Sequence, residues 1–127
     1  MNELTKKGLE TYTSIRGKEG AKTWEDRIEK GGFGSAMKEL SAQYSFGSVW
    51  ARDGLARRDK SLVTIGILLA LRQTEELKHH ISIGITHGLT IKEIEEIFIH
   101  ATVYAGFPAA DVAMQAAQEV FKELGLN

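Results

Sequence analysis

The residues best suited to acid–base chemistry in this sequence are its histidines, three of which fall in one short segment. His80 and His87 are seven residues apart, which places them on one face if the segment is helical, and His79 points about 100° away. Glu76 precedes His80 by one helical turn, and a carboxylate at that spacing can orient an imidazole and favour its protonated form. This arrangement suits a general acid working near neutral pH. The alternative is a solvated helix face with an incidental ion pair.

A second polar pair lies in a more apolar segment. His100 stands between Ile97 and Ala101, and Tyr104 follows one turn later. One interpretation is that His100 and Tyr104 line a pocket between helices. The other is that His100 is a hydrogen-bonded histidine of the core.

Three arginines, Arg52, Arg57 and Arg58, cluster just before a long apolar segment. The guanidinium fork binds carboxylates in a bidentate way, so these residues are candidates for holding an acidic substrate. Trp50 is close enough in sequence to form a pocket wall. The alternative is a solvated turn in which Trp50 belongs to the core.

Other kinds of chemistry have little support. The sequence has no cysteine, which excludes disulfides, thiolate metal sites and thiol nucleophiles. Glu76 and His79 have the Glu-x-x-His spacing of dimetal helix bundles, but such sites need two of these motifs and two further glutamates, so we expect no metal. Ser61 lacks the Gly-x-Ser-x-Gly context of a hydrolase nucleophile.

Length and composition are those of an ordinary globular chain. The 127 residues predict one domain over 1–127, and a net charge of −1 gives no sign of nucleic-acid binding. No apolar run reaches the roughly 18 residues of a membrane span. The first residues contain no apolar stretch, so we expect no secretory signal and a cytoplasmic protein.

The element pattern predicts an all-α fold of about six helices with short connections, because apolar residues recur at helical spacing between glycines. A first helix is expected to end at Gly17. Residues 62–71 are nearly all apolar and predict a helix that is buried on most faces, capped by Asp59. Thr90 and Glu93 predict a capping box. A small domain with such an apolar helix has much apolar surface to cover, and this favours a homo-oligomer.

Many residues between positions 44 and 124 follow a known order and spacing. They are Trp50, Arg52, Gly54, Leu55, Arg58, Ser61, Leu62, Val63, Glu76, His80, Gly88, Leu89, Thr90, Glu93, Ile94, His100, Tyr104, Ala105, Gly106, Pro108, Ala109 and Ala110. In this pattern the chain resembles the carboxymuconolactone decarboxylase family. The resemblance implies an alkyl-hydroperoxidase-like helical fold, assembly into homotrimers or homohexamers, and sites near the subunit contacts.

The resemblance also distinguishes two branches of that family. Gln73 and Glu76 stand where the alkyl hydroperoxidase branch has its two cysteines, so peroxidase activity should be absent. The chain resembles the cysteine-free γ-carboxymuconolactone decarboxylases. That likeness implies decarboxylation, without a cofactor, of an unsaturated carboxy-γ-lactone of the 4-carboxymuconolactone type. The product would be an enol-lactone of the β-ketoadipate pathway of aromatic-compound catabolism.

For the site, the resemblance together with the spacing implies that His80 donates a proton and is oriented by Glu76. His100 and Tyr104 would donate hydrogen bonds to the lactone oxygen. The remaining expected binding residues are Arg52 or Arg58 for a carboxylate, Trp50 as a pocket wall, and Ser61.

Two positions depart from the family pattern. Ser48 stands where that branch commonly has a glutamate, and Asp53 replaces a proline. The change at Ser48 leaves two alternatives open. One is a different reaction, such as isomerisation or hydrolysis of a small lactone or enone. The other is a helical oligomer without catalytic activity.

Overall fold

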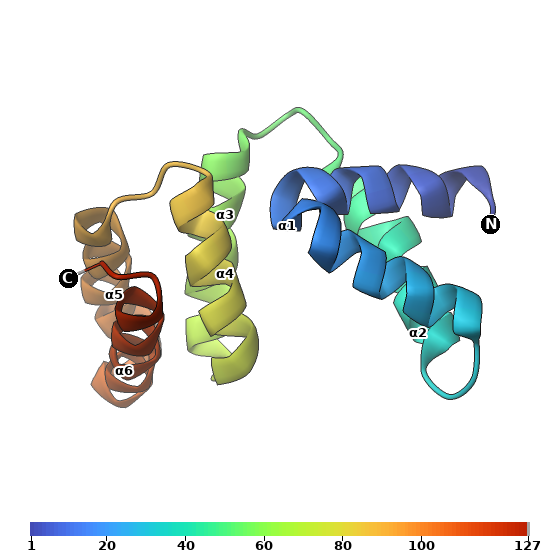
Figure 1. Cartoon of the computed structure of the whole chain (residues 1–127). Helices are drawn as coiled ribbons and strands as arrows, with labels where there is room; N and C mark the ends of the chain where they lie inside the picture. Colours follow the sequence, from blue (N-terminus) through green and yellow to red (C-terminus); the bar gives the residue numbers. More distant parts are fainter. Residues whose placement is uncertain (127) are drawn as a thin grey trace. The chain divides into compact units, whose positions relative to one another are not determined.

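The computed structural model describes residues 1–126, and its regular elements over that range are all helical, which confirms the predicted all-α class (Figure 1). The chain divides into two compact units, Met1–Leu55 and a second beginning at Ala56. The elements are α1 (Glu3–Lys30), α2 (Ser35–Ser41), the π-helix η1 (Ala42–Trp50), α3 (Arg57–Ala70), α4 (Thr74–Thr86), α5 (Ile91–Ala105) and α6 (Phe107–Glu123).

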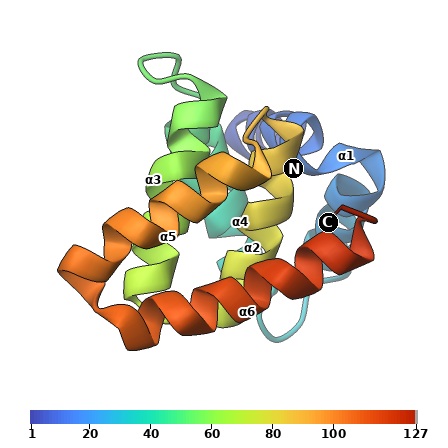
Figure 2. The same ribbon diagram turned by 90° about the vertical axis from the view of Figure 1, so that its left-hand side faces the viewer.

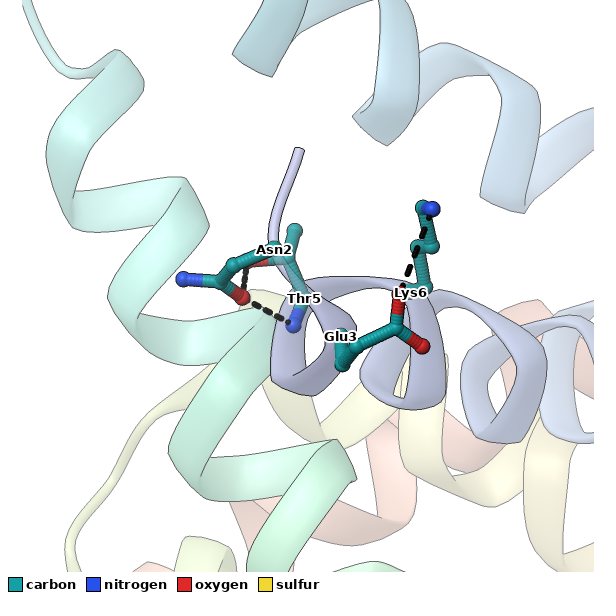
Figure 3. A network of polar contacts seen from close by, with 4 residues as sticks. All are labelled: Asn2, Glu3, Thr5 and Lys6. Atoms are coloured by element: carbon teal, nitrogen blue, oxygen red, sulfur yellow. Dashed lines mark hydrogen bonds and ion pairs between the residues drawn. The ribbon is translucent and has the colours of Figure 1, made fainter.

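The first unit begins with a capped helix. Both the backbone N–H and the hydroxyl of Thr5 donate to Asn2 Oδ1 at 2.8 Å, and Lys6 pairs with Glu3 at 3.4 Å (Figure 3). The chain leaves helical geometry at Gly17, where φ is 84°, but resumes it at once, so α1 has two limbs. The predicted helix end at Gly17 is therefore a kink.

The packing of α1 against η1 is close. A Cβ added to Gly8 would lie 1.8 Å from the carbonyl oxygen of Ala42, so only glycine fits there. An aromatic cluster completes this unit: the rings of Tyr12 and Trp24 stack at 4.4 Å, and Phe46 stacks on Trp50 at 6.5 Å. Trp50 thus packs against this aromatic cluster and is only partly buried.

In the second unit α3 packs against α4 and α5, and α6 packs against α4 and α5. Figure 2 shows α5 and α6 running side by side. Large apolar side chains from all four helices fill the interior. The most deeply buried are Ile65, Leu69, Leu77, Ile81 and Ile94, and α6 adds Val120 to this core.

Helix ends and faces test the sequence predictions further. The capping box is confirmed: Glu93 N–H donates to Thr90 Oγ1, and Thr90 N–H donates to Glu93 Oε1, both at 3.0 Å. The predicted cap by Asp59 is wrong, because α3 starts after Ala56 without a side-chain cap and Asp59 lies in the first turn. The prediction that α3 is buried on most faces is also wrong, since Val63 and Ile67 are each about half exposed.

Two further findings concern residues 1–126. None of their helices combines the length and apolarity needed to cross a membrane. Nor do three or more His, Asp or Glu side chains gather there closely enough to hold a metal ion.

Candidate functional site

The centre of the predicted acid–base site is on α4. Glu76 Oε2 lies 4.0 Å from His80 Nε2, and Glu76 Oε1 lies 3.8 Å from His79 Nδ1. The Glu76 carboxylate therefore lies within ion-pair distance of both imidazole rings. His80 is mostly buried, with 13% of its side chain exposed, whereas Glu76 is 62% exposed. This pair places a shielded imidazole beside a solvated carboxylate, which is an arrangement capable of proton transfer.

His87, two turns after His80, ends α4 and faces α3. Its Nδ1 lies 3.1 Å from the hydroxyl oxygen of Ser61, and Ser61 is fully buried. Burial lowers the pKa of His87, and the positive charge of Arg57 lowers it further, while a backbone hydrogen bond with Arg57 acts the other way. These effects favour the neutral form of the His87 ring.

A groove of about 770 Å³ runs between α3 and α5. His100 and Tyr104 both line it, with ring centroids 5.4 Å apart, and both side chains are exposed. His100 is therefore a surface residue of the described chain rather than a histidine of the core. The rest of the lining is largely apolar, with Lys92, Glu93 and Glu96 at the end where α5 begins.

Arg58 is engaged at that charged end. Its guanidinium pairs with Glu93, and Asp59 lies 3.8 Å away. Glu93 thus combines three roles, since it also closes the capping box with Thr90 and lines the groove. A substrate carboxylate at Arg58 would have to share the guanidinium with Glu93.

Trp50 and Arg52 belong to the first unit, at the end of η1. π-Helices are rare and often mark functional segments. Ser48 lies in this one, and its hydroxyl donates to the carbonyl of Gln43 at 3.1 Å. Arg52 follows in an exposed turn, where its N–H donates to the carbonyl of Val49 at 3.1 Å.

Comparison with known proteins agrees with these features. The family model described as "Carboxymuconolactone decarboxylase family" matches residues 35–119. The chain belongs to this family. It is 37% identical over 121 residues to the 4-carboxymuconolactone decarboxylase of Acinetobacter baylyi, covering 95% of this chain and 89% of that protein. It is also 36% identical to a nitrosuccinic acid decarboxylase of Metarhizium robertsii, over 68% of this chain and 61% of that protein.

Within this carboxymuconolactone decarboxylase family domain, the structure brings some of the expected residues together. Glu76 meets His80 on α4, and His100 meets Tyr104 in the groove. His80 is not part of the groove lining. Ser61 is buried against His87 instead of facing the groove.

Sequence reasoning missed the pairing of His87 with Ser61. The available signal was its spacing of two turns from His80, which places the two histidines on one face of α4. No sequence pattern indicated which residue of α3 would stand opposite.

Proposed function

We propose that this protein is a carboxy-lyase that decarboxylates an unsaturated carboxy-γ-lactone of the 4-carboxymuconolactone type. The observation that carries the proposal is 37% identity, over 95% of the chain, to a protein named for that activity. The shielded His80 beside Glu76 supports it, because the reaction needs a proton donor.

The reaction is balanced without a cofactor. The bond between the ring carbon and the carboxylate carbon breaks, CO₂ leaves, and the electron pair flows into the conjugated lactone carbonyl. A proton then adds to the dienolate carbon. In this proposal His80 supplies that proton and recovers one from solvent, and Glu76 orients the ring.

The arginine should bind the carboxylate of the substrate's acetate side chain rather than the carboxylate that leaves as CO₂. A tight grip on the departing carboxylate would stabilise the ground state, and only contacts that strengthen in the transition state raise the rate. Arg58 and Arg52 are the proposed cations. Because Glu93 already pairs with Arg58, binding at Arg58 exchanges one carboxylate for another.

Hydrogen bonds to the lactone oxygen would stabilise its developing charge. His100 and Tyr104 are the proposed donors, since both present polar groups in the part of the groove that lies away from its charged end. Trp50 is the proposed pocket wall.

A second candidate reaction is decarboxylation of a nitro acid, favoured by the likeness to the nitrosuccinic acid decarboxylase. Both reactions follow one logic, because a nitro group and a conjugated carbonyl each accept the electron pair that CO₂ leaves behind. Release of CO₂ from 4-carboxymuconolactone and from nitrosuccinate, measured side by side, tests the choice. A ratio of kcat/KM well above ten in favour of the lactone is expected. A higher kcat/KM for nitrosuccinate would mean that a nitro acid, and not the lactone, is the substrate.

Assembly into a homotrimer or homohexamer in the cytoplasm is part of the proposal. Exposed apolar side chains support self-association in both units. On the first unit they follow helical spacing at Phe33, Met37, Leu40 and Tyr44, and on the second they include Ile67 at the groove.

Light scattering tests this assembly. The mass of the wild type in solution should be three or six times 14.0 kDa. Ile67→Glu should weaken the assembly. Lys122→Glu, in the exposed last turn of α6, should leave it unchanged. A wild type that is monomeric in solution would refute the proposed assembly. Cell fractionation tests the proposed cytoplasmic location.

A further inference from the structure

The corner where α4 ends and α3 begins contains a buried polar contact that the proposed reaction does not use. Ser61, in the second turn of α3, is 0% exposed, and its hydroxyl oxygen lies 3.1 Å from His87 Nδ1. A buried hydroxyl gains from such a partner, because leaving it unsatisfied costs more than the hydrogen bond itself contributes.

The backbone fixes the position of His87. Its N–H donates to the carbonyl of Ile83 at 2.9 Å. Gly88 then turns the chain with φ 100°, and Leu89 N–H donates to the carbonyl of Gly84 at 2.9 Å. The end of α4 therefore fixes the backbone of His87 at the point where its ring lies beside Ser61 of α3.

On the α3 side, Ser61 stands one turn after Arg57, and the charge and the backbone of Arg57 both act on the His87 ring. Arg58 is the next residue. Any displacement of the first turn of α3 relative to α4 would carry both guanidinium groups with it, because helices move as rigid elements.

From this geometry we infer that Ser61 and His87 are positioning residues that hold the Arg57–Arg58 turn in place for binding the substrate's carboxylate. The inference rests on the proposed function for its substrate, but not for the placement of the arginines. A serine hydroxyl both donates and accepts, so it fits either tautomer of the ring. Ser61 thus takes part in binding through α3 rather than by touching the substrate.

Four variants test the inference. Ser61→Ala removes the hydroxyl, and His87→Leu removes the ring nitrogens. His87→Asn keeps a polar group near the place of Nδ1. Thr64→Val is the matched control, because it removes a hydroxyl from the same helix that donates only within it, to the carbonyl of Lys60 at 2.8 Å.

The first readout is kinetic. Ser61→Ala and His87→Leu should raise KM for 4-carboxymuconolactone about three- to tenfold, which is the range of one buried hydrogen bond, with kcat within about twofold of wild type. His87→Asn should have a KM close to the wild-type value, and Thr64→Val should have the wild-type KM. A purely structural role would lower the melting temperature of Ser61→Ala without changing the KM of the folded enzyme.

The second readout does not depend on turnover. The NMR signals of the Arg57 and Arg58 side-chain N–H groups should shift in Ser61→Ala and His87→Leu, and stay in place in Thr64→Val. If the wild type does not convert the lactone, the proposed function fails while these signals still decide the inference. Unchanged arginine signals in both variants, or an unchanged KM in a folded Ser61→Ala, would overturn it.

Discussion

Replacing Glu76 by glutamine removes a charge beside His80 and keeps the shape of the side chain. The two groups are 4.0 Å apart, and Glu76 is 62% exposed, so water screens the pair. Two unit charges at that separation in water interact with about 1 kcal/mol, which corresponds to about fivefold in rate. We therefore expect Glu76→Gln to lower kcat by about fivefold or less, whereas His80→Gln should lower it by about 10²–10⁴-fold as the loss of an acid–base group.

The assay is steady-state decarboxylation of 4-carboxymuconolactone, followed by loss of ultraviolet absorbance. Glu75→Gln is the matched control, because Glu75 is more exposed and pairs with Lys78 at 3.4 Å instead of with a histidine. It should be silent. A loss of 100-fold or more in Glu76→Gln would refute the reasoning, because a screened pair cannot account for it and Glu76 would then act directly on the substrate.

Three further predictions concern stability, each read from the free energy of unfolding in urea or the melting temperature. Thr90→Ala breaks the capping box of α5 and should cost about 1 kcal/mol. Thr102→Ala removes a partly exposed hydroxyl that bonds only within α5, and it should stay within about 0.5 kcal/mol; equal effects would argue against the cap. Gly8→Ala places a Cβ against the carbonyl of Ala42 and should cost about 1–3 kcal/mol or more, so a neutral result would contradict the close approach. The pKa of His87 is lowered in the folded chain, so the unfolded chain binds the proton first and stability should fall as pH drops below about 6.5; His87→Asn should flatten that slope, and an unchanged slope would contradict the burial of the ring.

The local features that sequence predicted best are those set by neighbouring residues. The capping box needs only Thr90 and Glu93, and Glu76 reaches His80 because the α-helix places residues four apart on one face. The kink at Gly17 also follows from its own backbone freedom, with φ at 84°. What the pattern could not tell was that helical geometry resumes after it.

Long-range features were harder to predict. Periodicity shows that α3 is apolar, but not that Val63 and Ile67 would remain exposed while Ile65 is buried. Ser61 was expected to bind the substrate; the structure shows its hydroxyl beside His87 on another helix, and its role in binding stays a prediction. Such contacts depend on the register of two packed helices, which a single sequence does not contain. The roles of Arg52, Trp50, His100 and Tyr104 in binding stay predictions.

The most direct test of the proposed function is the stoichiometry of CO₂ released from 4-carboxymuconolactone by the wild type and by His80→Gln. The wild type should release one CO₂ for each lactone consumed, at a turnover of about 10 s⁻¹, which is typical of enzymes. His80→Gln should be folded and slower by at least about 100-fold. A folded wild type that releases no CO₂, or a His80→Gln variant as fast as the wild type, would contradict the account.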